Sequence, residues 1–192
     1  MQKISDYWKE INDELDKINT VLPHLENNIS IRRVLGGADW VNVADQFIKD
    51  AEIKEGDNVL EIGGGIGLLC EEFKKQKEVN YSLLDTPSML RIAKKHLSDR
   101  DVKCDFYEEL PDKKFDLLIA INCLSEMPRE YVEYLLGNAK CKSAAIIDGD
   151  PQGDFDQWLE KILHNNFKSV VKWNNYAIHG TDNQSYYLCK NV

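Results

Sequence analysis

Residues 59–67 read VLEIGGGIG, and this stretch decides the fold class of the chain. A mostly apolar run leads into three successive glycines and then Gly67, and residues 68–73, LLCEEF, have the character of a helix. Glycine lets a backbone adopt positive φ and lets a ligand approach main-chain atoms, because no Cβ stands in the way. The stretch therefore predicts a strand, a tight turn and a helix, with a ligand resting on the turn.

The spacing of the glycines separates two kinds of ligand site. A dinucleotide fingerprint needs G-x-G-x-x-G, but the frame that begins at Gly63 and Gly65 reaches Leu68 where the third glycine belongs. Glu61, Gly63, Gly65 and Gly67 instead spell acidic-x-G-x-G-x-G. This pattern resembles the first motif of class I S-adenosylmethionine-dependent methyltransferases, in which the methionine moiety of the cofactor lies over the turn.

A second acidic residue lies at the distance that such a site requires. Residues 80–84 form an apolar run that leads to Asp85, about 20 residues beyond the glycines, where a nucleotide-binding α/β unit places the carboxylate for its ribose. A carboxylate can accept two hydrogen bonds from a vicinal diol. Asp85 could instead only cap a helix that begins near Pro87, because Asp is favoured before a helix. The two motifs in order, each at the end of a predicted strand, favour the cofactor interpretation.

Length and composition indicate one globular domain. The chain has 192 residues, of which 43% are hydrophobic and 30% are charged. No run reaches the roughly 18 apolar residues of a membrane span, and the N-terminus lacks the apolar segment of a signal peptide. We therefore expect a cytoplasmic protein with no membrane partner. The sequence indicates no particular oligomeric state.

Charge and cysteine content argue against two other classes. The net charge is −9 and the basic residues are scattered, whereas a nucleic-acid binder gains much of its affinity by neutralising phosphates. We therefore expect a small-molecule substrate and not DNA or RNA. The five cysteines are odd in number and lack metal-ligand spacing, so they are interpreted as reduced thiols.

From residue 58 onward, strand and helix patterns alternate, which is typical of a mostly parallel sheet covered on both faces. The expected fold is α/β, a Rossmann-like sheet of seven mostly parallel strands, and the resemblance to the methyltransferase sheet implies that the last two strands form a hairpin that inserts an antiparallel strand. Strands are expected over residues 58–62, 80–84, 102–106, 115–121, 144–148, 167–173 and 185–190, and helices over residues 67–76, 88–97, 130–139 and 155–164.

Residues 1–55 differ from the core, which we place at residues 56–192. Apolar residues from Ile4 to Leu22 recur at spacings of three and four, which predicts an amphipathic helix that ends at Pro23. A second helix is expected over residues 39–50. These helices form a predicted N-terminal helical cap, and they either cover the substrate, as in small methyltransferases, or only shield one edge of the sheet.

Three segments together support a narrower resemblance. Residues 61–67 (EIGGGIG), 82–90 (SLLDTPSML) and 115–128 (FDLLIAINCLSEMP) are similar to bacterial sugar O-methyltransferases. The resemblance implies methylation of a sugar or a similar small polar metabolite, with S-adenosylmethionine as the cofactor. A methyltransferase-like binding module without catalysis is the alternative, because fold does not fix function.

The resemblance also implies which residues contact the cofactor. Many relatives have an acidic residue after the third strand that binds the adenine amino group, and here Asp105, next to Phe106, is the nearest candidate. Met89 follows the ribose carboxylate and could contact the adenine ring. The complete set of implied cofactor contacts is Glu61, Gly63, Gly64, Gly65, Gly67, Asp85, Thr86, Met89, Asp105, Phe106 and Asn122.

Two residues are candidates for a general base. Glu126 lies just past the end of the fourth predicted strand, and a carboxylate there could take the proton of a hydroxyl as it is methylated. It could also be an ordinary acidic residue before a helix, where the helix dipole favours it. His179 lies between the last two predicted strands and has a side chain that titrates near neutral pH.

An acidic cluster follows the fifth predicted strand. Asp148, Asp150 and Asp154, with Asn122 nearby, could hold Mg²⁺ through oxygen ligands. Glycine and proline between these carboxylates are typical of a turn, with Asp154 as the N-cap of the next helix. We favour the turn, and therefore expect no metal ligands.

Overall fold

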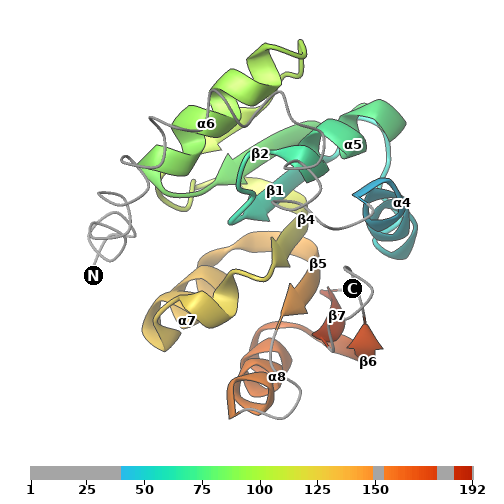
Figure 1. Cartoon of the computed structure of the whole chain (residues 1–192). Coiled ribbons are helices and arrows are strands. Elements are labelled where there is room, and N and C mark those ends of the chain that lie inside the picture. The colour runs from blue at the N-terminus through green and yellow to red at the C-terminus, as the bar shows by residue number, and fades with distance from the viewer. Residues whose placement is uncertain (1–39, 149–153, 177–183, 192) are drawn as a thin grey trace.

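The computed structural model describes residues 40–148, 154–176 and 184–191. Three of the sequence predictions concern residues outside these ranges: the helix that ends at Pro23, the residue Asp150 and the residue His179. The described chain forms one seven-stranded sheet with the order β3-β2-β1-β4-β5-β7-β6 (Figure 1). Its strands are β1 (Asn58–Ile62), β2 (Asn80–Leu84), β3 (Asp105–Tyr107), β4 (Lys114–Ile121), β5 (Lys140–Asp148), β6 (Ser169–Tyr176) and β7 (Gln184–Lys190).

The sheet has the predicted topology. The neighbouring pairs among β1 to β5 are all parallel, and β7 runs antiparallel to both β5 and β6, between which it lies. The chain connects outward from β1 to β2 and β3, and then returns to β4 on the other side of β1. Ligands of open α/β sheets bind outside the carboxyl ends of the strands at such a switch point, here between β1 and β4.

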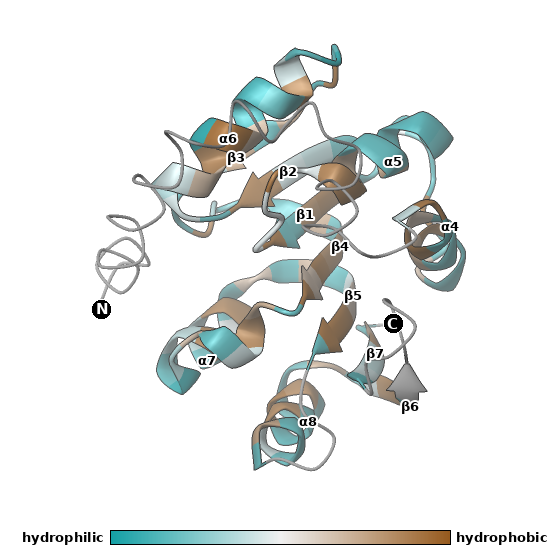
Figure 2. Cartoon of the chain, in the orientation of Figure 1, coloured by the Kyte–Doolittle hydropathy of each residue, from teal (hydrophilic) through white to brown (hydrophobic). Residues whose placement is uncertain are grey.

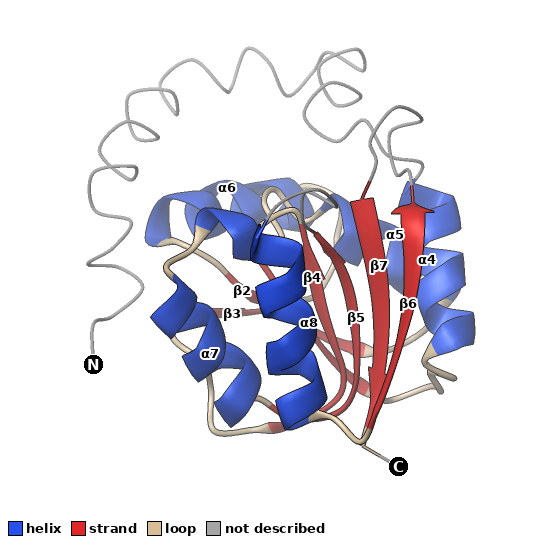
Figure 3. Cartoon of the chain, turned by 90° about the horizontal axis from the view of Figure 1, so that it is seen from below, coloured by secondary structure: helices blue, strands red, loops and turns tan. Residues whose placement is uncertain are grey.

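Helices cover both faces of the sheet (Figure 3). One face carries α4, α5 and α6, and the other carries α7 and α8. A short 3-10 helix, η2 (Leu124–Glu126), follows β4. The helix bounds are α4 (Trp40–Asp50), α5 (Leu68–Gln76), α6 (Pro87–Ser98), α7 (Arg129–Asn138) and α8 (Asp154–Asn166). Among the described residues, no helix has the length and apolar character needed to cross a bilayer.

Each face of the sheet has its own apolar core. Phe47, Phe73 and Tyr81 are fully buried on the α4–α5–α6 face, whereas Leu159 and Leu163 of α8 are buried on the other. The central strands β4 and β5 are hydrophobic along most of their length because both of their faces are covered (Figure 2). This buried sheet fixes where the loops at its carboxyl edge lie.

Helix α4 packs onto the sheet as part of the same core. Phe47 lies beside Tyr186 of β7, with 5.7 Å between the ring centroids, and the Tyr186 hydroxyl donates to Asp50 at 2.7 Å. Residue 39, where this helix was expected to begin, lies outside the described residues, and the division of the chain at residue 55 stays a prediction.

Two predicted strands, over residues 102–106 and 167–173, begin too early. The backbone N–H of Val102 donates to the carbonyl of Leu97 at 2.9 Å, so this residue closes the end of α6 and the strand starts only at Asp105. The N–H of Phe167 likewise donates to Leu163 and closes α8. In both places an apolar residue that the pattern assigned to a strand instead hydrogen-bonds to the last turn of the preceding helix and packs against the core.

The fifth predicted strand begins too late. The parallel ladder with β4 starts at Lys140, four residues before the expected start, although that end of the strand is polar. The exposed Lys142 side chain pairs with Asp116 of β4 at 2.5 Å. Pairing with a neighbouring strand therefore extends β5 beyond its hydrophobic segment.

Candidate active site

The glycine turn between β1 and α5 needs glycine for two different reasons. Gly63 has φ of +68°, and a Cβ there would lie 2.6 Å from Cβ of Cys123, which follows β4. Gly67 has φ of +84° and stands directly before α5, where a Cβ would meet Leu97 at 2.9 Å. Both positions combine left-handed backbone with close packing, so other residues would be strained there.

The middle of the turn has one packed side and one open side. A Cβ on Gly64 would lie 2.4 Å from Leu83 and 2.9 Å from the Glu61 carboxylate, so this backbone rests directly on the sheet. A Cβ on Gly65 would meet only Met89 among the described residues, at 3.9 Å. The open side at Gly65, with a thioether at its edge, is the cradle that a ligand lying over the turn requires.

Asp85 connects the end of β2 to this turn. One carboxylate oxygen accepts from the backbone N–H of Gly65 at 3.0 Å and the other from the N–H of Thr86 at 2.7 Å. Burial raises the pKa of Asp85 to about 6, although both hydrogen bonds act in the opposite direction. The structure thus brings the two sequence motifs together.

Thr86 caps helix α6, and Asp85 does not. The hydroxyl of Thr86 accepts from the backbone N–H of Met89 at 3.3 Å, and Pro87 occupies the first helical position. This arrangement matches the preferred start of a helix. The capping role considered for Asp85 therefore belongs to its neighbour, and the Asp85 carboxylate serves the turn.

Glu61 lies beneath the glycine turn, away from its open side. Its side chain is buried, and the Tyr81 hydroxyl donates to its carboxylate at 3.0 Å. Loss of hydration raises the pKa of Glu61 to about 8, the Tyr81 hydrogen bond lowers it, and the charge of Asp85 raises it further. A cation bound on the turn would favour the ionised forms of both carboxyl groups.

The end of β4 lies against the glycine turn. The Cys123 thiol donates to the carbonyl of Ile62 at 3.2 Å. Asn122 has φ of +50°, and its backbone N–H donates to Ile147 of β5 at 2.8 Å. Its side-chain oxygen accepts a hydrogen bond from the amide of Gln184. Sequence reasoning missed Gln184, although β7 was expected to run antiparallel and its first residue then lies at the carboxyl edge.

Asp148 serves the backbone of the β4–η2 connection. One of its carboxylate oxygens accepts from the backbone N–H groups of Cys123, Leu124 and Ser125, at 3.0, 2.6 and 3.2 Å. Asp154 is an exposed residue that begins α8 and does not precede it. Across the described ranges, no group of three or more His, Cys, Asp or Glu side chains is arranged to hold a metal ion.

Glu126 is an exposed residue at the end of η2. Its pKa is raised, first by partial burial of the carboxyl group and then by the negative charge of Asp148. It does not begin the following helix, because Met127 intervenes and Pro128 is the N-cap of α7. The environment of Glu126 therefore makes it a better proton acceptor than an ordinary surface carboxylate.

Asp105 lies away from the carboxyl edge, contrary to the adenine contact expected for it. It is the first residue of β3, pairs with Ser82 in the ladder, and faces Lys113 at 3.6 Å. It lines a cavity of about 650 Å³ with Asn80 at the amino-terminal ends of the strands. The Phe106 ring is covered by Lys94, whose Nζ lies 5.3 Å from the ring centroid.

The acidic residue that directly follows β3 is the exposed Glu108. The prediction missed it because the strand was expected to end at residue 106, one residue before its actual end at Tyr107. A shift of the strand end changes which carboxylate stands at the carboxyl edge, where ligands of open α/β sheets bind.

The strand order, the glycine turn at the switch point and the carboxylate at the end of β2 define a nucleotide-binding α/β domain of the methyltransferase type. Residues 59–141 match the family model described as "Methyltransferase domain". This match covers less than half of the chain, and the sheet of the described residues has the Rossmann-like fold of class I S-adenosylmethionine-dependent methyltransferases.

Individual proteins are similar to parts of the chain. Ribosomal RNA small subunit methyltransferase A of Clostridioides difficile is 33% identical over 81 residues, which is 38% of this chain and 28% of that protein. A candidate O-methyltransferase from Nostoc punctiforme superposes with a TM-score of 0.64 at 16% identity, over 86% of this chain and 58% of the other. The chain thus spans less than two thirds of either of these two proteins.

The fold is also matched along the whole chain. Magnesium protoporphyrin IX methyltransferase from Synechocystis, solved with bound S-adenosylhomocysteine, superposes with a TM-score of 0.65 at 16% identity, over 98% of both chains. At such low identity, the likeness shows the common fold and leaves the methyl acceptor open.

Proposed function

We propose that the protein transfers a methyl group from S-adenosylmethionine to a hydroxyl of a sugar or a similar small polar metabolite. The observation that carries this proposal is Glu126, a carboxylate with a raised pKa placed just beyond β4. The resemblance of residues 61–67, 82–90 and 115–128 to sugar O-methyltransferases supports the class of acceptor, and the net charge of −9 argues against a nucleic-acid substrate.

The residues at the carboxyl edge suit the cofactor. The open side of the turn at Gly65 would take its methionine moiety, with Met89 providing an apolar contact. Asp85 would bind the ribose diol, because each carboxylate oxygen has a lone pair beyond the one that its backbone donor occupies. Glu108 would take the adenine contact that was first expected of Asp105. When bound, the cofactor supplies a methyl group on a positively charged sulfur.

The acceptor side needs a group that removes a proton. A sugar hydroxyl is a weak nucleophile, so a carboxylate that takes its proton as the new bond forms accelerates transfer. Glu126 has this role in our proposal, and its raised pKa brings it nearer to the pH at which it would act. His179, outside the described residues, is the second candidate.

Transfer of tritiated methyl groups to a panel of nucleotide sugars, small metabolites and ribosomal RNA tests the proposal. We expect label in a sugar or polar metabolite and none in RNA. Incorporation into RNA alone would replace the proposed acceptor class with the one named for the Clostridioides difficile relative. Binding of S-adenosylhomocysteine without transfer to any panel member would favour the non-catalytic alternative.

The role of Glu126 is tested separately. Glu126→Gln keeps size and shape, so it should leave S-adenosylhomocysteine affinity unchanged and lower turnover by about a hundredfold or more. Glu130→Gln, an exposed acidic residue in the first turn of α7, is the matched control and should keep full activity. Full activity of Glu126→Gln would exclude it as the base, and His179→Ala would be the next variant. Activity should also be insensitive to EDTA.

A further inference from the structure

The side chain of Gln184 has one amide atom in use and one without a partner. Its nitrogen donates to the side-chain oxygen of Asn122, whereas its oxygen Oε1 is buried and has no hydrogen-bond partner in the structure as described. Buried polar atoms in native proteins are almost always hydrogen-bonded, so each exception calls for an explanation. A ligand that donates a hydrogen bond would supply one.

The position of Gln184 makes the methyl acceptor the ligand to consider. Gln184 begins β7, which is antiparallel, so it lies at the carboxyl edge where the parallel strands end. Its partner Asn122 directly precedes Cys123, which packs against Gly63 of the cofactor turn. The amide pair therefore lies on the β7 side of the switch point, at the same carboxyl edge of the sheet as Glu126.

Asn122 holds the amide of Gln184 in one orientation. Its own backbone is fixed, because its N–H donates to Ile147 at 2.8 Å and its φ is +50°. With Asn122 Oδ1 accepting from the Gln184 nitrogen, the Gln184 oxygen is left to face a different partner. A neutral amide oxygen accepts a hydrogen bond without removing the proton, which distinguishes it from a carboxylate.

We propose that Gln184 binds the methyl acceptor by accepting a hydrogen bond from a hydroxyl that is not itself methylated, with Asn122 as the residue that positions the amide. This inference rests on the proposed function and deepens it. The carboxyl edge of the sheet then carries one carboxylate, Glu126, that takes a proton, and one amide oxygen that orients a second hydroxyl. A ligand with several hydroxyl groups, as in a sugar, fits both.

Two substitutions at one position test the hydrogen bond in the kinetics. Gln184→Leu removes both amide atoms at similar size and should raise KM for the panel sugar that is methylated fastest by about fivefold or more, the scale of one lost hydrogen bond. Affinity for S-adenosylhomocysteine should stay within about twofold. Gln184→Glu keeps an acceptor oxygen but places a second oxygen against Asn122 Oδ1, so it should recover only part of the lost KM effect. The control, Gln46→Leu on the exposed part of α4, should change neither value.

Side-chain amide NMR tests the same contact without knowledge of the natural acceptor. Glycerol, a hydroxyl donor, is titrated into protein saturated with S-adenosylhomocysteine. The chemical shifts of the Gln184 and Asn122 side-chain amides should change until they reach a plateau, and the chemical shift of the Gln46 amide should not change. Trimethylamine N-oxide, which has no donor, should produce no such shift. Absence of the glycerol response would overturn the inference.

The two arms separate failure of the inference from failure of the proposed function. If the protein methylates sugars and Gln184→Leu leaves KM unchanged, the role of Gln184 is refuted and the proposed function stands. A saturable glycerol response in a protein that methylates no sugar would support the hydroxyl-binding amide and refute the sugar as acceptor.

Discussion

The carboxylate of Asp85 accepts a hydrogen bond from the backbone N–H of Gly65 at 3.0 Å, across 20 residues of sequence. This bond ties the end of β2 to the open part of the glycine turn after β1. The two motifs that suggested a cofactor site are therefore parts of one hydrogen-bonded unit, and a change in one should be felt in the other.

Asp85→Ala should weaken S-adenosylhomocysteine binding. If the carboxylate makes two charge-assisted bonds to the ribose, each should be worth roughly 1.5–3 kcal/mol. Calorimetry measures the change, and Asp99→Ala, at the exposed end of α6, is the control. NAD should not bind to the unmodified protein. Unchanged affinity in Asp85→Ala would place the ribose contact elsewhere.

Stability should decrease as pH rises from about 4.5 to about 8 because of Glu61. Within that window the folded protein keeps the Glu61 proton while the unfolded chain has lost it, so raising the pH favours unfolding. Asp85, with a pKa raised from 3.8 to about 6, contributes in the same direction at lower pH. Urea unfolding at several pH values should show this slope reduced in Glu61→Gln, which keeps an acceptor for Tyr81. An identical slope in both proteins would contradict the assignment.

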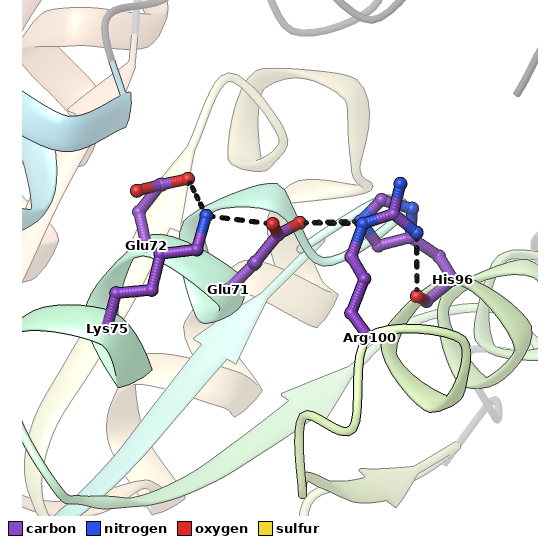
Figure 4. Close-up of polar contacts among 5 residues, drawn as sticks. All are labelled: Glu71, Glu72, Lys75, His96 and Arg100. Carbon is purple, nitrogen blue, oxygen red and sulfur yellow. Dashed lines mark hydrogen bonds and ion pairs between the residues drawn. The ribbon is translucent and has the colours of Figure 1, made fainter. Parts of the chain in front are cut away.

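A cluster of polar contacts around the buried Glu71 joins α5 to the C-terminal end of α6 (Figure 4). One oxygen of Glu71 contacts His96 at 3.0 Å and Arg100 at 3.3 Å, and the other accepts from Lys75 at 2.9 Å. Lys75 also bridges to Glu72 at 2.7 Å, nearer to the surface. Glu71 is therefore the shared partner of three basic side chains.

Glu71→Ala should destabilise the fold by roughly 1–3 kcal/mol, because the buried His96 ring loses its hydrogen bond to this carboxylate. Glu72→Ala removes a carboxylate from the same helix, but one in a more exposed pair, and should cost no more than about 1 kcal/mol. Denaturant unfolding measures both. Equal costs for the two variants would show that burial of the Glu71 cluster does not matter for stability.

Gly67→Ala should destabilise more than Gly56→Ala. Both glycines have left-handed backbones, with φ of +84° and +81°, so each alanine pays the conformational strain of about 1–2 kcal/mol. Only at Gly67 does the new Cβ also meet a buried side chain, Leu97 at 2.9 Å, whereas at Gly56 nothing described lies within 4 Å. The difference between the losses of unfolding free energy in the two variants isolates the packing cost. A difference near zero would mean that the Leu97 side chain moves aside without a measurable cost.

The sequence by itself determined the strand–turn–helix around residues 59–67 and the carboxylate at the end of β2. These features depend on local spacing: β1 and β2 have the bounds that the apolar pattern predicted. The class of cofactor site followed from the same short range of residues, since the glycines and Asp85 lie on consecutive strand ends.

Only the tertiary structure decided which side chains share the carboxyl edge. Asn122 and Gln184 are 62 residues apart and meet because an antiparallel strand enters the sheet beside β5. Asp148 accepts hydrogen bonds from three backbone N–H groups because β5 ends beside the β4–η2 connection. Such contacts between residues distant in sequence cannot be predicted from local sequence, because they depend on where the hydrogen-bonded ladder of a neighbouring strand begins and ends.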